Sequence, residues 1–129
     1  MSESPYSVFH DFTSDNIDCV ITEAHPGNYV LGSVALFNGD KTFLVKYVGR
    51  SDSDVHSKLK MHLNDIRFGK IKKFAFQYAD SPNEAFEREC MDYHRYGESQ
   101  ELMNGGHPGK PQGSYRKCPI CHELLNLGE

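Results

Sequence analysis

Residues 27–49, GNYVLGSVALFNGDKTFLVKYVG, decide the fold of this chain. Two runs rich in β-branched and aromatic residues flank the sequence Asn-Gly-Asp at 38–40. An Asn-Gly pair between such runs is the strongest short-range signal for a β-hairpin. The pattern therefore predicts paired strands over residues 29–37 and 41–48.

Each predicted strand carries a tyrosine near the end away from the turn, Tyr29 in the first and Tyr47 in the second. Directly opposed residues share a sheet face, so a two-residue loop would pair Tyr29 with Val48 and place the two tyrosines on opposite faces. A three-residue loop over 38–40 would bring both phenols to one face, and so would a β-bulge at Gly32. If the tyrosines form one site, one of these two arrangements must hold.

The composition indicates a polar globular protein of one domain. At 129 residues the chain is long enough to bury roughly two thirds of its unfolded surface. No window approaches the ~18 uninterrupted apolar residues of a membrane span, and the amino terminus lacks a basic-then-apolar signal pattern. We therefore expect a cytoplasmic protein with no membrane partner, in which the four cysteines are ligands or buried thiols rather than disulfides.

The net charge of −4 conceals a strong asymmetry. Residues 41–73 contain nine basic and three acidic residues, a local charge of +6, so the remainder carries −10. A basic block in an acidic chain is typical of a surface that binds phosphate backbones, and a solvated lysine-rich surface is the alternative. Overlap with the tyrosine hairpin favours nucleic acid as the partner. The candidate nucleic-acid-binding residues are Lys46, Arg50, Lys58, Lys60, Arg67, Lys70, Lys72 and Lys73.

A first main helix is predicted after the hairpin. The sequence Ser-Asp-Ser-Asp at 51–54 offers several N-caps, and Gly69 is the expected end. Lys58 and His62, four residues apart, lie beside the apolar stripe of this helix and can point at the same place. The stripe recurs at spacings of four, four and three and consists of Val55, Leu59, Leu63 and Ile66.

A third strand and a second main helix are predicted next. Residues 74–78 alternate as a strand does, and Ser-Pro-Asn-Glu at 81–84 forms a capping box. We expect the second helix to run from Pro82 to about Tyr96, with Gly97 as its end. Its buried stripe is predicted to contain Phe86, Cys90 and Tyr93, with Glu89 on the margin of that stripe.

We divide the chain into three parts. Residues 1–26 are interpreted as an arm that packs loosely or covers a sheet edge, with 19–22 as a candidate short strand. Residues 27–104 form the main domain, and 105–129 form a loop-rich tail. A long loop in a small domain usually has a function.

A Gly-x-Tyr strand, a hairpin and a Tyr-Val-Gly strand followed by a basic helix resemble the GIY-YIG nuclease domain. The likeness covers roughly residues 27–104. It implies a small α/β domain with a three-stranded mixed or antiparallel sheet and two main helices. It also implies an endonuclease that hydrolyses DNA phosphodiester bonds with Mg²⁺ or Mn²⁺.

The resemblance also implies roles for individual residues. Tyr29 and Tyr47 take the places of the motif tyrosines, one of them a plausible general base. Glu89 ends a Glu-Ala-x-x-x-Glu helix motif and takes the metal, while Asn104 matches the loop asparagine. Arg50 fills a position that the family often gives to a basic residue.

Two residues on the following helix complete this set. His62 takes the place of a histidine that can shuttle a proton. Lys58 stands where the family has an arginine, and lysine cannot clamp two phosphate oxygens in a planar fork. Asn28 also departs from the motif by replacing an apolar residue, which we interpret as a change on an edge strand.

The alternative function follows from Lys58. A domain of this fold that has lost cleavage would serve as a nucleic-acid-binding or protein-interaction module. A homodimer or a protein that provides specificity is a further candidate partner, because no second DNA-reading segment is visible in the sequence.

Cys118-x-x-Cys121 is half of a tetrahedral zinc site. Cys90 and His94, four apart on the second helix, are predicted as the other half, because side chains at that spacing share one helix face. His107 and His122 are reserve ligands. In the alternative, Cys90 is a buried core residue and the cysteine pair is free or binds metal weakly.

Overall fold

The computed structural model describes residues 6, 8–113 and 117–121. A four-stranded antiparallel sheet in the order β1-β4-β2-β3 carries helices on both faces. The elements are β1 His10–Asp11, α1 Ser14–Val20, β2 Gly27–Phe37, β3 Asp40–Ser51, α2 Val55–His62, the 3-10 helix η1 Ile66–Phe68, β4 Lys73–Tyr78, α3 Pro82–Arg95 and α4 Glu98–Glu101.

The predicted hairpin and third strand are present, but the sheet has four strands rather than three. The fourth is β1, which pairs its two residues with Phe74 and Lys73 at the outer edge of β4. The N-terminal arm thus covers a sheet edge, as expected. The strand predicted over 19–22 is wrong, because Thr13 caps a helix that runs through Cys19 and buries Ile17.

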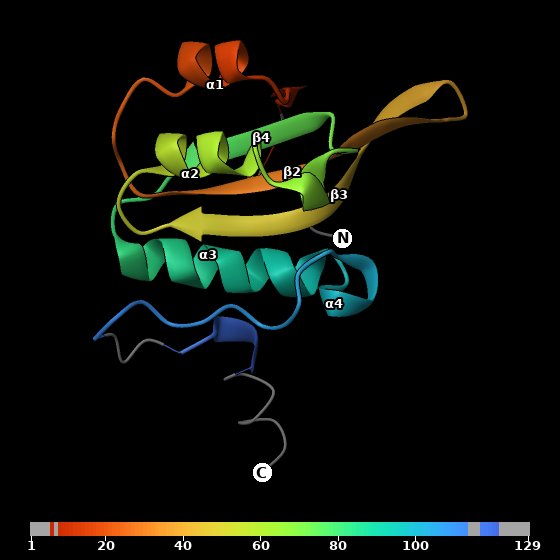
Figure 1. Ribbon diagram of the computed structural model, residues 1–129. Helices are drawn as coiled ribbons and strands as arrows, with labels where there is room; N and C mark the ends of the chain where they lie inside the picture. Colours follow the sequence, from red (N-terminus) through yellow and green to blue (C-terminus); the bar gives the residue numbers. More distant parts are fainter. Residues whose placement is uncertain (1–5, 7, 114–116, 122–129) are drawn as a thin grey trace.

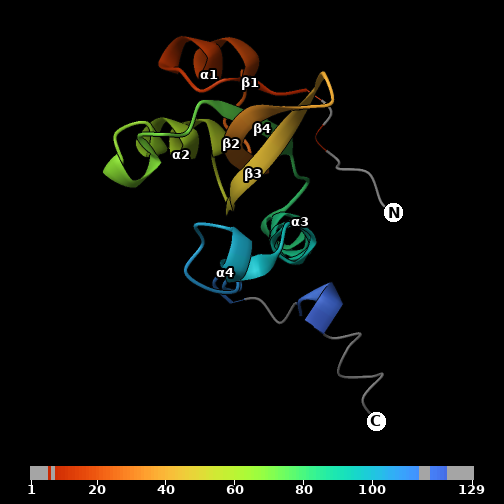
Figure 2. The same cartoon turned by 90° about the vertical axis from the view of Figure 1, so that its right-hand side faces the viewer.

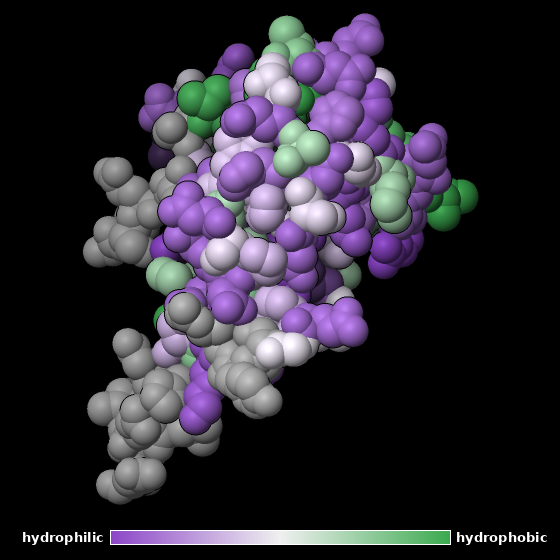
Figure 3. Space-filling model, turned by 90° about the vertical axis from the view of Figure 1, so that its left-hand side faces the viewer, coloured by the Kyte–Doolittle hydropathy of each residue, from purple (hydrophilic) through white to green (hydrophobic). Residues whose placement is uncertain are grey.

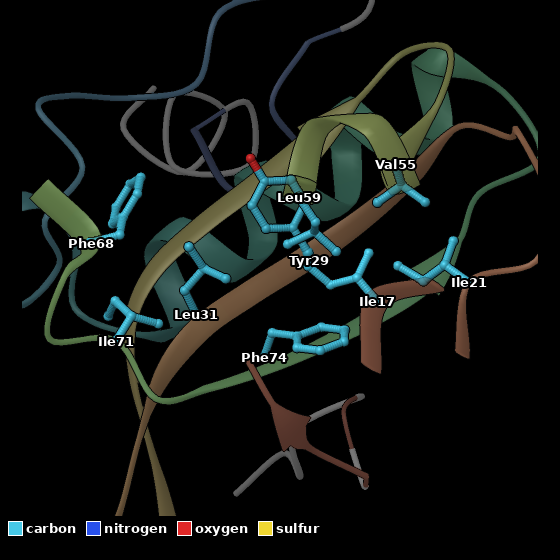
Figure 4. Packing of buried hydrophobic residues seen from close by; sticks show 9 residues of the cluster. All are labelled: Ile17, Ile21, Tyr29, Leu31, Val55, Leu59, Phe68, Ile71 and Phe74. Atoms are coloured by element: carbon cyan, nitrogen blue, oxygen red, sulfur yellow. The ribbon is translucent and has the colours of Figure 1, made fainter. Parts of the chain in front are cut away.

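The helices form two layers around the sheet. Figures 1 and 2 show α1 and α2 on one face of the sheet and α3 on the other, with α4 beside the C-terminal end of α3. The α1 and α2 side holds the larger apolar cluster, in which the Tyr29 ring packs against its neighbours and its hydroxyl points away from Phe74 and Ile17 (Figure 4). The cluster contains Ile17, Ile21, Tyr29, Leu31, Val55, Leu59, Phe68, Ile71 and Phe74.

The α3 side holds a second cluster. Val30, Val48 and Ala75 of the sheet pack there with Tyr93 and Leu102. Because successive strand residues point to opposite faces, Tyr29 and Val30 belong to different clusters. The central strand β2 is therefore apolar on both faces, and this fixes its register.

The hairpin combines a two-residue turn with a β-bulge. Asn38 and Gly39 have φ angles of 53° and 85°, and Phe37 pairs directly with Asp40. Alone, this turn would separate the tyrosines, but the register shifts between Leu31 and Gly32. Gly32 pairs with Val45 and Leu31 with Tyr47, so Lys46 is the extra residue. The bulge brings both tyrosines to one face, as one of the two predicted arrangements required.

Gly32 is needed at the bulge for a steric reason. A Cβ atom there would lie 2.0 Å from the carbonyl oxygen of Leu44, closer than any real contact. A side chain at this position would force the strands apart at the point where the register changes. The glycine therefore protects the alignment of Tyr29 with Tyr47.

The helix predicted after the hairpin is shorter than expected. It ends at His62, and Ile66 begins the separate η1 with 95% of its surface exposed. The assignment of Ile66 to the buried stripe is therefore wrong, and Phe68, 3% exposed, fills the core there instead. By contrast, α3 starts at Pro82 with Ser81 as its N-cap, as predicted.

Candidate functional site

A pocket of about 460 Å³ opens at the outer edge of β3. Its walls come from β2, β3, α2, α3 and the segment after α4. The lining residues are Tyr29, Tyr47, Gly49, Arg50, Ser51, Asp52, Lys58, Glu89, Gly109 and Lys110. Figure 3 views the molecule from the end where β3 finishes and α3 begins, and hydrophilic side chains dominate this face.

Gly49 allows groups from both sheet faces to reach this one pocket. The Tyr29 ring lies across Gly49, where a Cβ atom would come within 2.4 Å of the tyrosine Cζ and hydroxyl oxygen. The Tyr29 and Tyr47 rings stack with centroids 6.4 Å apart and an interplanar angle of 23°. Because β3 is the outermost strand here, the phenols on its α2 side and Glu89 on its α3 side line the same cavity.

Tyr29 forms a buried pair with His62. The hydroxyl oxygen lies 2.5 Å from His62 Nε2, and both residues are at most 6% exposed. Burial and the nearby charge of Lys58 lower the pKa of His62 to about 4, so the ring is neutral at pH 7. Burial, together with the proximity of Tyr47 and Glu89, raises the pKa of Tyr29. Both partners of this hydrogen bond are therefore uncharged near neutral pH.

Tyr47 is the more accessible phenol. Burial and the proximity of Glu89 raise its pKa. Neither tyrosine is thus a phenolate at neutral pH, and a base role would require proton transfer to a partner. For Tyr29 that partner is His62, so the predicted proton shuttle is in hydrogen-bond contact with the predicted base.

Glu89 lies in the pocket wall beside Arg50, on the margin of the α3 stripe as predicted. Its Oε1 accepts a hydrogen bond of 2.6 Å from Arg50, and each side chain is 12% exposed. Burial raises the pKa of Glu89 to about 7 against the opposing effect of Arg50. The carboxylate is therefore incompletely compensated, since Arg50 also pairs with Asp52 at 2.8 Å.

Lys58 lines the pocket from α2. It lies one helical turn before His62 and lowers the pKa of that ring, so the two side chains share a region as predicted. Among the described residues, Lys58 has no ion-pair partner. Its ammonium group is available to an anion that enters the pocket.

Asn104 does not line the pocket, but it holds the strand that does. Its Oδ1 accepts a hydrogen bond of 3.0 Å from Val48 N, and its Nδ2 donates one of 2.8 Å to Val48 O. The neighbouring Met103 N donates to Lys46 O at 2.6 Å. Residues 103 and 104 thus cover the outer edge of β3 as a partner strand would, next to Tyr47 and Gly49.

Asn28 was interpreted as a change on an edge strand, and this is wrong because β2 lies between β4 and β3. The side chain is fully buried, and its Nδ2 donates a hydrogen bond of 2.8 Å to Ala85 O of α3. It ties β2 to α3 one turn before Glu89. Its Oδ1 is a buried acceptor that has no hydrogen-bond partner in the described part of the chain.

A second cluster of functional side chains joins α3 to the tail. His94, His107, Cys118 and Cys121 place their ligand atoms within 4.8 Å of one another, so together they can hold a metal ion. Cys121 Sγ lies 3.4 Å from His94 Nε2 and 3.6 Å from His107 Nε2. The reserve ligand His107 thus occupies the place predicted for Cys90.

The surroundings orient both imidazoles toward the cluster. His94 Nδ1 lies 2.6 Å from Glu98 Oε2, and His107 Nδ1 lies 2.9 Å from Pro108 O. A carbonyl oxygen only accepts hydrogen bonds, and an ionised carboxylate does the same, so each Nδ1 carries the proton. The lone pair of each neutral ring is then on Nε2, the atom that faces Cys121.

Cys90 lies outside this ligand group. It is fully buried with Phe86 and Cys118 in a small apolar cluster, and burial raises the pKa of its thiol. The alternative interpretation of Cys90 as a core residue describes its surroundings better than the ligand interpretation. The other reserve ligand, His122, lies outside the described residues.

Comparison of the chain with models of protein families, with curated proteins and with solved structures finds no match in any of the three. Within the described part of the chain, no helix is long and apolar enough to cross a lipid bilayer.

The predicted basic surface is partly neutralised by the protein itself. Lys60 pairs with Asp18, Arg67 with Asp65, Lys73 with Asp11, and Arg50 with Asp52 and Glu89. Four of the eight candidate nucleic-acid-binding residues are therefore engaged in ion pairs. The others are Lys46, Lys58, Lys70 and Lys72.

Five residues that line the pocket were not predicted as site residues: Gly49, Ser51, Asp52, Gly109 and Lys110. Gly109 and Lys110 follow a glycine-rich run, and nothing in their spacing indicates that they return to β3. The unusual length of this loop was the available signal, since long loops in small domains tend to form functional surfaces.

Proposed function

We propose that this chain is a divalent-metal-dependent endonuclease that hydrolyses phosphodiester bonds, with DNA as its substrate. One observation carries the proposal. One hydrophilic pocket is lined by two stacked tyrosines from β2 and β3, a largely buried carboxylate from α3 and a lysine from α2. This lysine has no ion-pair partner among the described residues. Phosphodiester hydrolysis needs a positioned water, a cation for the phosphate and a group that stabilises the leaving oxygen.

The Tyr29 and His62 pair provides a route for the proton of the attacking water. Tyr29 borders the pocket although it is fully buried, and its hydroxyl is hydrogen-bonded to His62, which is 6% exposed. In this proposal the hydroxyl accepts the water proton as its own proton passes to His62 Nε2. The His62 ring becomes cationic while Tyr29 keeps a proton. The pair of Tyr29 and His62 therefore holds one proton more than before, and no phenolate accumulates.

Lys58 and Glu89 have electrostatic roles in this proposal. Lys58 binds a non-bridging phosphate oxygen as a point charge. Glu89 Oε1 pairs with Arg50, which leaves Oε2 to bind a divalent cation, and Arg50 keeps Asp52 as a partner when it does. A single carboxylate suits Mg²⁺, which stays largely hydrated, and the bound ion would neutralise charge on the leaving oxygen.

The alternative is a nucleic-acid-binding or protein-interaction module that does not cleave. Lys58 favours this alternative, because it stands where the family that the sequence resembles has an arginine. A lysine is a point charge and cannot fix two phosphate oxygens at once. The first proposal predicts that the pocket binds DNA and cleaves it. The alternative predicts that the pocket binds a nucleic acid or a protein without cleavage.

A plasmid-nicking assay with Mg²⁺ or Mn²⁺ separates the two proposals. We expect Glu89→Gln and Lys58→Ala each to reduce nicking at least about 100-fold while leaving the fold intact. Glu23→Gln, which changes an exposed acid that does not line this pocket, is the matched control. Nicking that survives Glu89→Gln would mean that this pocket is not the catalytic site.

We also infer that the ion held by the Cys/His cluster is a structural Zn²⁺. Two thiolates and two neutral imidazoles form a soft four-ligand set that suits zinc, and four protein ligands close the site to catalysis. The two thiolates balance the charge of the ion. The Cys121 amide donates a hydrogen bond of 3.5 Å to Cys118 Sγ, which stabilises a thiolate there.

Metal analysis of the purified protein tests this assignment. We expect one zinc per chain, lost or much weakened in Cys118→Ser and His107→Ala. Cys90→Ser is the informative control, because that residue lies next to Cys118 but outside the ligand group. Retention of zinc by His107→Ala together with its loss in Cys90→Ser would restore the set predicted from the sequence.

A further inference from the structure

The metal cluster and the pocket share one segment of chain. His107 belongs to the cluster, and Gly109 and Lys110, two and three residues later, line the pocket at β3. In Figure 1 this segment runs from α4 back along α3 toward the end where β3 finishes. Whatever fixes His107 therefore also limits where Lys110 can lie.

Few other contacts hold this segment. Among the described residues, 105–113 make no backbone hydrogen bond to the sheet or to α3. Outside its own segment, His107 approaches Cys121 and Cys118 and makes ring contacts with Tyr93 and His94, with centroids 5.5 Å and 5.2 Å away. Pro111 is the buried residue within 105–113.

The segment is also costly to order. It contains four glycines, and a Cβ atom at any of them would meet nothing within 4 Å, so packing does little to restrain the backbone there. Fixing each backbone residue costs about 1–2 kcal/mol in conformational entropy. A metal bond to His107 is the strongest restraint available to offset that cost.

Lys110 adds a positive charge that the protein does not neutralise. Arg50, which also lines the pocket, is held by Asp52 and Glu89. Within the described residues, Lys110 has no ion-pair partner, and the same is true of Lys58. The two lysines enter the pocket from different elements, so they can contact different phosphates of one strand.

We propose that Lys110 is a phosphate-binding residue of the pocket and that the Cys/His metal centre presents it there. The inference rests on the proposed function for the identity of its ligand. In the metal-loaded protein, His107 holds the segment and Lys110 contacts a phosphate beside the one bound by Lys58. Without the metal the segment leaves β3, and the pocket loses that cation but keeps its tyrosines, Glu89 and Lys58.

Binding of a short fluorescent DNA duplex to the full chain, in Ca²⁺ to limit turnover, tests the proposal. Each variant is measured zinc-loaded and after treatment with a zinc chelator that spares Ca²⁺. We expect Lys110→Ala to weaken binding about 5- to 10-fold in the zinc-loaded protein and less than about 2-fold in the chelated one. Lys117→Ala, an exposed lysine of the same tail that does not line the pocket, should have no effect in either form.

Amide hydrogen exchange supplies a readout that does not depend on DNA. Chelation should speed exchange in residues 105–111 at least about 10-fold and leave β2 and β3 unchanged. If chelation unfolds the chain, His107→Ala replaces it, because that variant removes the segment's own ligand and leaves three others.

The outcomes separate this inference from the proposed function. The inference is overturned if the amide exchange rate in residues 105–111 does not depend on zinc, or if Lys110→Ala changes DNA affinity equally in both forms. Either result leaves the endonuclease proposal standing. Absence of DNA binding by the unmodified protein in both forms overturns the proposed function, and with it the role of Lys110. Zinc-dependent exchange together with a zinc-dependent effect of Lys110→Ala supports the inference.

Discussion

Gly49 shows how one residue determines which groups can meet. It has no side chain where the Tyr29 ring crosses β3, so a phenol from the central strand reaches the outer edge of the sheet. A larger residue at position 49 would overlap the Tyr29 ring and displace it from the pocket wall. The site therefore depends on an absent side chain as much as on the side chains that line it.

Gly49→Ala should destabilise the protein by about 1–3 kcal/mol, because the new methyl group would overlap the buried Tyr29 ring. The opposing gain from a less flexible unfolded chain is smaller, about 0.4–1 kcal/mol. The measurement is the free energy of unfolding in urea. Gly105→Ala is the control, since a Cβ atom there would meet nothing within 4 Å. Equal stability of Gly49→Ala and the unmodified protein would contradict the close approach.

The buried pair of Tyr29 and His62 predicts a specific pH dependence. The pKa of His62 is lowered from 6.5 to about 4, so folding favours the neutral ring. This contribution, on the order of 3 kcal/mol, is complete above pH 6.5 and is lost as the pH falls toward 4. We expect NMR titration of the His62 ring to give a pKa near 4, and a higher value in Lys58→Ala because a nearby positive charge is removed.

Global stability alone would hide this effect. The pKa of Glu89 is raised from 4.5 to about 7, so its contribution is present below pH 4.5 and is lost as the pH rises through 7. The two contributions change in opposite directions between pH 4.5 and 6.5. The residue-specific titration is therefore needed, with Lys72→Ala as control. A His62 pKa near 6.5, or one that Lys58→Ala does not change, would rule out the buried pair.

At the scale of elements, local signals were sufficient where a turn or cap is encoded by adjacent residues. Asn38-Gly39 made the hairpin predictable, and Ser81 with Pro82 fixed the start of α3. The two-residue strand β1 was not predictable, because its pairing with β4 joins residues about sixty positions apart through backbone groups. The sequence also left open whether a bulge or a longer loop aligns the tyrosines, since both satisfy the same alternation.

The metal cluster illustrates the same limit. Cys90 and His94 do lie one turn apart on α3, but Cys90 packs against Phe86 while His94 lies beside Glu98. The choice between Cys90 and His107 depends on the path of a loop that contains no regular structure. Spacing predicted Cys90, His94, Cys118 and Cys121 as candidate ligands, and the structure groups His107 with the last three in place of Cys90.

Asn104 connects these elements, and its loss should expose the outer edge of β3. Asn104→Ala removes both hydrogen bonds to Val48, with an expected cost of about 1–2 kcal/mol because water can still reach that edge. Asn104→Asp should not restore stability, since its carboxylate would face the carbonyl oxygen of Val48. Amide exchange at Val48 is the measurement, with the exposed Asn64→Ala as control. Unchanged protection of Val48 in Asn104→Ala would show that other contacts hold this strand.

At the scale of the whole molecule, an acidic protein presents a small set of uncompensated cations. The net charge is −4, and four of the nine basic residues in 41–73 form ion pairs with acids of α1, β1, α3 and the block's own turns. Long-range attraction of DNA should therefore be weak. Binding should depend on a few lysines near the pocket rather than on a broad basic surface.

The salt dependence of DNA binding measures how many of these cations take part. If all eight candidate residues contacted phosphates, log K would fall with log salt concentration with a slope of about −7. The internal ion pairs leave Lys46, Lys58, Lys70 and Lys72 of that set, and Lys110 joins them, so we expect a slope no steeper than about −4.5.

Two lysine variants show which residues produce that slope. Lys58→Ala should make it shallower by about 1, because one phosphate contact is lost. Lys60→Ala is the matched comparison on the same helix, and its pairing with Asp18 predicts almost no change. A slope near −7, or an equal response to the two substitutions, would mean that the ion pairs open on binding and that the basic block acts as one continuous surface.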